Sequence, residues 1–187
     1  MGQTRRSFIH NAGIGLLTFC VDGCDVDLSP REARARGADF GVLSANEVVS
    51  IDALGEILVP GSTVAGLAHF IDHQLGTTVD QQLLMIKYLG INPPFLPFYR
   101  GALAALEAGA TTRHGASFAE LDADAKAAFV AEIAKANPQG WEGPAAPFFH
   151  FVLRADAVDV VYGTKDGIER LGLPYMAHIE PPSRWGG

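Results

Sequence analysis

Residues 146–162 read APFFHFVLRADAVDVVY. Wound as an α-helix, this stretch is apolar nearly all round, which is typical of a helix in a protein core or under a partner. Its Val-rich end also suits an extended conformation, because β-branched residues favour strands. The fold is therefore expected to form around this segment. The alternative is that a partner protein covers its apolar surface.

Helix signals precede this segment along most of the chain. Ser44 and Glu47 form a capping box ahead of an apolar run at helical spacing, which ends at Pro60-Gly61. Further helices are predicted over residues 64–75, from Thr77 or Thr78 to Leu89, over residues 98–108, and from the capping box at Ser117 to Ala136. These signals predict an all-α fold.

The chain divides into three parts. Residues 1–28 form a leader, residues 29–43 an extended connection, and residues 44–187 one compact multi-helix domain. From about Gly163 onward, Gly and Pro recur among aromatic residues, which predicts an ordered arm without regular structure.

Composition and charge exclude several classes of function. The chain has 21 acidic residues against 14 Lys plus Arg, a net charge of -7, so it lacks the basic surface of a nucleic-acid-binding protein. Its apolar run at the front, Ala12 to Val21, is far shorter than the roughly 20 residues that span a bilayer. We expect no transmembrane helix.

The N-terminus carries a twin-arginine export signal. Thr4-Arg5-Arg6-Ser7-Phe8-Ile9 precedes a weakly hydrophobic run, with Arg5, Arg6 and Phe8 as its characteristic residues. The chain should therefore meet the twin-arginine translocase transiently and reach the periplasm folded. Export in the folded state suits an assembly that holds a cofactor. Cleavage stays open, because the small-residue motif Ala33-Arg34-Ala35 lies well downstream of the run.

Cys20 and Cys24 are the two cysteines of the chain. In an oxidising periplasm they could form a disulfide, although the loop between them is short. Lipidation of Cys24 and two free thiols are the alternatives.

Candidate catalytic groups are few. His69 and His73 lie one helical turn apart with Asp72 between them, which could form part of a metal site, although histidines near a helix end commonly bind backbone carbonyls. Asp156 and Asp159 are best explained by a solvated helix face or by an arginine of a partner. No phosphate-binding loop or nucleophile elbow occurs, so we expect no catalytic or cofactor-binding residue in this chain.

The order of landmarks resembles one known family. After the leader come Glu56-Ile-Leu-Val-Pro60, Phe70-Ile-Asp-His-Gln-Leu75, the Phe148-Phe149 pair, Tyr162-Gly163 and a tail rich in Gly, Pro and Trp. This order is similar to that of the gluconate 2-dehydrogenase subunit 3 family over most of Glu47 to Trp185. The tail from Gly163 is closer to small subunits linked to glucoside 3-dehydrogenases.

The resemblance implies a function for the chain within a complex. Members are small subunits of periplasmic flavin-dependent dehydrogenases that oxidise sugars, sugar acids or glycosides. Each binds a large FAD-containing subunit of the glucose-methanol-choline (GMC) type, stabilises it and lends it the export signal. A cytochrome c subunit usually accepts the electrons, and the complex can associate with the membrane. The FAD belongs to the partner, and this chain has no catalytic role of its own.

The residues expected at the partner interface are aromatic or lie among aromatic residues: Phe148, Phe149, His150, Tyr162, Tyr175 and Trp185. The alternative function is a stand-alone periplasmic metal enzyme that uses His69, Asp72 and His73.

Overall fold

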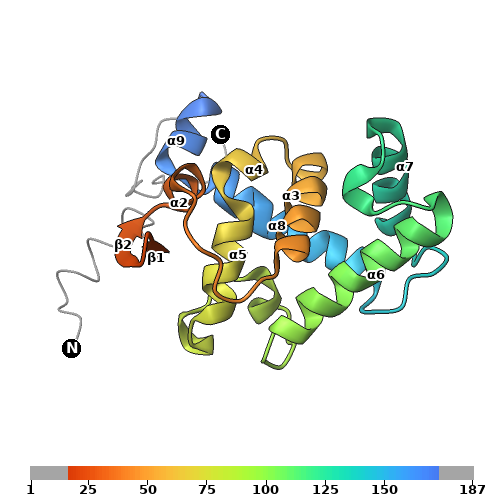
Figure 1. The fold of residues 1–187 in the computed structure, drawn as a ribbon, viewed down its shortest axis with the longest axis horizontal. Helices are drawn as coiled ribbons and strands as arrows, with labels where there is room; N and C mark the ends of the chain where they lie inside the picture. The colour runs from red at the N-terminus through yellow and green to blue at the C-terminus, as the bar shows by residue number, and fades with distance from the viewer. Residues whose placement is uncertain (1–16, 173–187) are drawn as a thin grey trace, which may run out of the picture.

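The computed structural model describes residues 17–172 and contains eight α-helices and one two-stranded sheet within them (Figure 1). The strands are β1 (Leu17–Val21) and β2 (Cys24–Leu28). The α-helices are α2 (Pro30–Arg36), α3 (Ala45–Leu58), α4 (Ser62–Ala65), α5 (Leu67–Gly76), α6 (Leu96–His114), α7 (Ala123–Ile133), α8 (Ala146–Tyr162) and α9 (Lys165–Arg170). Short 3₁₀ turns occur at η1 (Val79–Gln81), η2 (Met85–Tyr88) and η3 (Phe118–Glu120). The predicted all-α class is confirmed, with one hairpin added.

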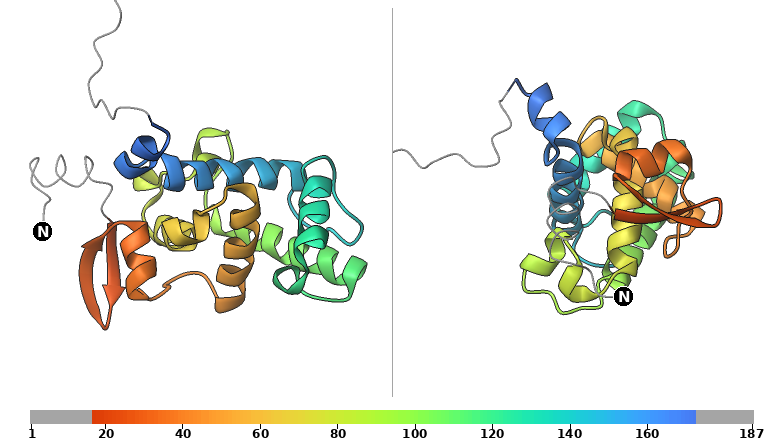
Figure 2. Two further views of the ribbon diagram at one scale, coloured as in Figure 1. Left: turned by 90° about the horizontal axis from the view of Figure 1, so that it is seen from above. Right: turned by 90° about the vertical axis from the view of Figure 1, so that its left-hand side faces the viewer.

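Helix α8 occupies the predicted segment and runs along the long dimension of the molecule (Figure 2, left). It begins where the Asn137 side chain accepts a hydrogen bond from the Ala146 N–H, and it ends at Gly163. It packs against α3, α4, α5, α6, α7, α9 and η2. Phe149, Val152, Leu153 and Ala157 of its inner face have no exposed surface. The core of the domain therefore forms around one side of this helix.

Part of the predicted leader, residues 1–28, forms regular structure. Leu17–Leu28 form an antiparallel hairpin whose two-residue loop, Asp22-Gly23, has positive φ angles of 50° and 77°. An Asp-Gly loop suits a tight hairpin, because its backbone twist matches that of the strands.

The predicted extended connection, residues 29–43, contains helix α2. Ser29 and Glu32 form a capping box, Pro30 lies in the first turn, and Gly37 ends the helix in the left-handed conformation. These residues are regular helix start and stop signals. The prediction of an extended connection was therefore wrong.

The helix predicted over residues 64–75 is broken. Gly66 adopts a φ of 85° and separates α4 from α5. A side chain at this position would overlap with the carbonyl group of Pro30, so the break lets the N-terminal segment approach closely.

The helix predicted up to Leu89 does not form, and η1 and η2 replace it. Side chains from outside the segment hold its backbone instead: Gln74 accepts from the Leu83 N–H at 2.6 Å, and Asp156 accepts from the Met85 N–H at 2.8 Å. Leu84 and Ile86 are both fully buried, so this segment still contributes to the core without forming an α-helix.

Three other boundaries differ from the prediction. Helix α6 extends over Leu96–His114, and the Ser117 capping box opens only η3, while Asp122 caps α7. The arm predicted to be irregular begins with α9, capped by Thr164. Within residues 17–172, no helix is long and apolar enough to cross a bilayer.

Candidate partner interface

The outer side of α8 carries apolar side chains that the domain itself covers only in part. Phe151 is 51% exposed and Val158 is 39% exposed, while Phe148, Ala155 and Tyr162 are half-buried. Neighbouring members of this set lie alternately three and four residues apart, so the five side chains form one line along the helix, opposite the core face. We name this set, Phe148, Phe151, Ala155, Val158 and Tyr162, the outer stripe of α8.

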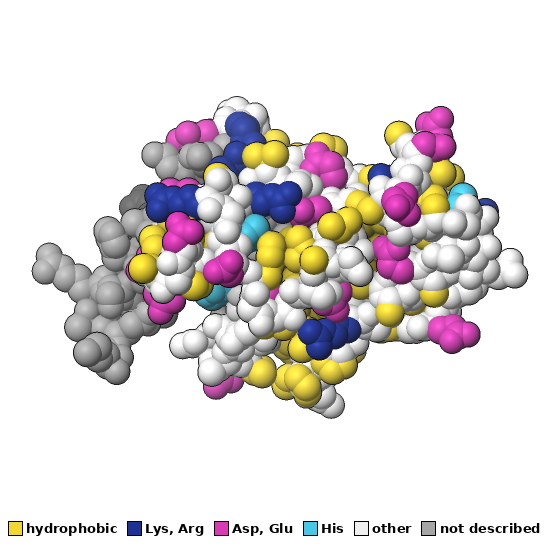
Figure 3. All heavy atoms as spheres, in the orientation of Figure 1, with side chains coloured by type: hydrophobic (Ala, Val, Ile, Leu, Met, Phe, Trp, Pro, Cys, Tyr) yellow, Lys and Arg dark blue, Asp and Glu magenta, His cyan; other side chains and the backbone are white. Residues whose placement is uncertain are grey.

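The segment from η1 to Ile91 also exposes large apolar side chains. Leu83, Tyr88 and Ile91 are 54%, 64% and 40% exposed, and η2 packs directly on α8. Figure 2 (right) shows this yellow-green segment and the blue α8 along the same side of the molecule. Figure 3 shows the face over α3 and α5, where acidic and basic side chains are spread among hydrophobic ones. Both α8 and this segment therefore expose apolar side chains of the kind that protein partners cover.

A buried carboxyl group attaches η2 to α8. Asp156 has no exposed surface and accepts a hydrogen bond from the Tyr99 hydroxyl at 2.6 Å as well as the one from Met85. Burial raises the pKa of Asp156 to about 7, against the opposing effect of these two hydrogen bonds. Asp156 was predicted to lie on a solvated face with Asp159, and this was wrong for Asp156. Asp159 is exposed, and desolvation raises its pKa.

The predicted interface residues of α8 are divided between its two sides. Phe149 is fully buried and packs against Phe98 and Trp141, so it is not available to a partner. Phe148, His150 and Tyr162 are half-buried, and desolvation together with Arg154 lowers the pKa of His150. The exposed residues Phe151 and Val158 were not among the predicted interface residues, although their helical spacing from Phe148 and Tyr162 was a usable signal.

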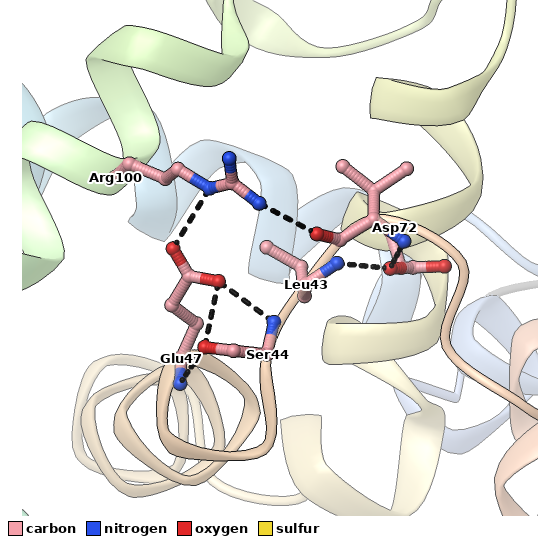
Figure 4. Close-up of polar contacts among 6 residues, drawn as sticks. Leu43, Ser44, Glu47, Asp72 and Arg100 are labelled. Atoms are coloured by element: carbon pink, nitrogen blue, oxygen red, sulfur yellow. Dashed lines mark hydrogen bonds and ion pairs between the residues drawn. The ribbon is translucent and has the colours of Figure 1, made fainter.

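Asp72 holds a loop. Its carboxylate accepts backbone N–H groups from Gly41, Val42 and Leu43 at 2.9, 2.9 and 2.7 Å. Figure 4 shows that Arg100 attaches the same loop by donating to the Val42 carbonyl oxygen and to Glu47. The Asp72 oxygens are therefore occupied by structural hydrogen bonds.

The neighbouring histidines pack against aromatic rings. His69 donates through Nε2 to the Ala38 carbonyl oxygen at 3.2 Å, and its ring lies 4.3 Å from that of Phe40. The His73 ring lies 5.3 Å from that of Phe19. Burial lowers the pKa of both histidines. No three His, Cys, Asp or Glu side chains within the described range are placed to hold a metal ion, so this geometry does not support a metal centre here.

Residues 45–178, which include α3 to α9, match the family model described as gluconate 2-dehydrogenase subunit 3. The chain belongs to this family. The match confirms the resemblance inferred from the order of motifs and places the chain among the subunits of dehydrogenase complexes. No curated protein and no solved structure matches it.

The family match covers the outer stripe of α8 but not the hairpin or α2. Of the residues singled out from the sequence, Arg5, Arg6, Phe8, Tyr175 and Trp185 lie outside the described residues.

The possible Cys20–Cys24 disulfide is not formed in this structure. Both thiols are free, and the hairpin register pairs Cys20 with Asp25 and Cys24 with Val21. Adjacent residues of a strand point to opposite faces, so the two sulfur atoms cannot meet without a change of the backbone.

Proposed function

We propose that this chain is the non-catalytic small subunit of an FAD-dependent dehydrogenase of the GMC type that oxidises CH–OH groups of sugars or glycosides. It binds the flavoprotein through the outer stripe of α8, stabilises it, and escorts it through twin-arginine export into the periplasm. The observation that carries this proposal is the one-sided burial of α8 in a member of a dehydrogenase subunit family.

The chemistry of the outer stripe supports a protein partner. Phe151 and Val158 expose large apolar surfaces, and covering each one releases on the order of 1 kcal/mol. Alternating spacings of three and four are those with which helices pack against one another, so a helix of the flavoprotein would fit along this line.

The polar groups of the described residues support a catalytic centre elsewhere. Asp156, whose raised pKa would suit a proton carrier, is closed off from solvent and paired with Tyr99 and Met85. A hollow beside α3 and α6 contains Glu47, Arg100 and Glu107, but these charges already bind one another or neighbouring backbone and hydroxyl groups.

The proposal therefore assigns FAD to the large subunit and electron transfer to a cytochrome c subunit of the complex. Through those subunits the complex can associate with the periplasmic side of the membrane. The substrate class follows the resemblance of the tail to glucoside 3-dehydrogenase small subunits.

Co-purification with the flavoprotein tests the interface. We expect the double variant Phe151→Glu, Val158→Glu to recover at least about 30-fold less FAD-containing partner, because two charges would be buried in an apolar contact. Recovered partner is measured by flavin absorbance after affinity capture of this chain.

Val49→Glu is the matched control, since Val49 is 51% exposed on α3, outside the outer stripe. It should recover as much flavoprotein as the unchanged chain. Equal recovery by the double variant, with its thermal stability unchanged, would contradict the assignment of the interface to α8.

A further inference from the structure

Residues 17–39, here named the N-terminal module, form a small folded unit with its own core. Phe19, Leu28, Ala33 and Ala38 are at most 5% exposed and pack together across the hairpin and α2. The Asp39 N–H donates to the Cys20 carbonyl oxygen at 3.0 Å, which ties the end of the module back to β1. The hairpin is therefore connected to the start of α2 by the chain itself and to the segment after α2 by this hydrogen bond.

The module is attached to the body at three places. The Phe19 ring lies 6.2 Å and 5.3 Å from the rings of His69 and His73 on α5. Arg34 forms an ion pair with Asp52 of α3 at 2.7 Å. The backbone of Pro30 lies so close to Gly66 that no side chain fits between them. These contacts join one module to α3, α5 and the link between α4 and α5.

The module overlaps the apolar run of the export signal. The run covers Ala12 to Val21, and strand β1 is formed by its second half, Leu17–Val21. A leader removed after this run would take β1 with it. A cut after Ala35 would remove the hairpin and most of α2, and within that helix Ala33 has no exposed surface.

Loss of the module would leave a damaged surface on the body. His69 is only 2% exposed, and it would lose its ring contact with Phe19. Asp52, whose pKa burial already raises, would lose the Arg34 guanidinium that opposes this shift.

We propose that the N-terminal module is a permanent part of the mature protein, so that any cut that removes the export signal falls before Leu17. Residues Leu17–Val21 thus serve twice, as part of the signal during export and as β1 of the folded protein. This inference rests on the export part of the proposed function and goes beyond it.

Intact mass of the full chain recovered from the periplasm tests the inference. We expect a mature N-terminus at or before Leu17, an uncut chain included. A mature N-terminus after Leu17, such as one after Ala35, would overturn it. If the chain stays in the cytoplasm, the export part of the proposed function fails, and the stability measurement below still decides the inference.

The second measurement compares two variants of the purified full chain. Phe19→Ala empties a buried site of the module and should lower the melting temperature by roughly 5 to 10 °C. Thr18→Ala, at an exposed position of the same strand, should change it by less than about 2 °C. Equal melting temperatures for both variants would show that the module does not belong to the folded protein and would overturn the proposal.

Discussion

Asp156 illustrates at the scale of one residue how the fold sets the chemistry of a side chain. Its carboxyl group joins α8 to α6 through Tyr99 and to η2 through Met85, without access to water. An ionised carboxylate is costly in such a place, so the pKa rises from 3.8 to about 7. The protonated form is therefore favoured by the folded state.

The sign of the resulting pH dependence follows from this shift. Below pH 3.8 the carboxyl group is protonated in both the folded and the unfolded chain, and its contribution to stability is complete. As the pH rises toward 7, the unfolded chain loses this proton first, and the free energy of unfolding falls by on the order of 4 kcal/mol in total.

Asp156→Asn should remove this dependence. Its amide keeps an acceptor for the Met85 N–H and a donor toward the Tyr99 oxygen, while no charge can form. Relative to the unchanged chain, the variant should gain about 2 to 3 kcal/mol in free energy of unfolding between pH 5 and pH 8, measured by urea denaturation. Parallel pH curves for Asp156→Asn and the unchanged chain would contradict the role given to this carboxyl group.

At the scale of elements, the break between α4 and α5 is set by packing against the N-terminal module. Gly66 combines a positive φ with the close approach of the Pro30 backbone, whereas Gly61 has a similar φ of 89° and open space around it. A substitution at Gly61 therefore measures the cost of the backbone conformation alone, and one at Gly66 measures that cost together with the steric overlap with Pro30.

Gly66→Ala should destabilise the protein by at least about 3 kcal/mol, because the left-handed conformation and the overlap with Pro30 act together. Gly61→Ala should cost only about 1 kcal/mol, the conformational part alone. Thermal or urea denaturation of both variants measures the difference. A similar loss for the two would mean that the module does not press on Gly66.

Local signals predicted some elements well and others not at all. The capping box at Ser44 and the apolar stretch of residues 146–162 act within their own helices, so α3 and α8 were predicted with correct type and nearly correct bounds. The segment up to Leu89 was wrongly predicted as a helix, because side chains outside it, Gln74 and Asp156, accept hydrogen bonds from its amides. Such contacts leave no local pattern.

The same distinction applies to the candidate interface. The sequence indicated that α8 lies in the core or under a partner, and the structure shows a core face and an exposed face on the same helix. The phase of the helix, which separates Phe149 from Phe151, depends on how α8 sits on its neighbours. The sequence therefore indicated the helix that carries the candidate interface, but not which side of that helix is exposed.

At the scale of the whole molecule, the proposed escort function makes the export signal act on two chains. Changing both Arg5 and Arg6 to Lys keeps the charge but removes the paired arginines that the translocase recognises. We expect the co-expressed flavoprotein to disappear from the periplasm, measured as FAD-dependent dehydrogenase activity of that fraction.

Arg36→Lys is the matched control, because Arg36 is exposed on α2 and lies outside the signal. It should leave the periplasmic activity unchanged. A flavoprotein that still reaches the periplasm with the double Lys variant has another route, and the escort role would then be wrong even if the α8 interface holds.

The length of α8 has a consequence for the unfolding of the domain. Because α8 contacts α4 and α5 as well as α6 and α7, the helices at both ends of the domain pack against this one helix. If the helices of either end unfolded alone, apolar side chains of α8 that they bury would become exposed to water. The helical domain should therefore behave as a single cooperative unit, with α8 as the last element to let its amide protons exchange with water.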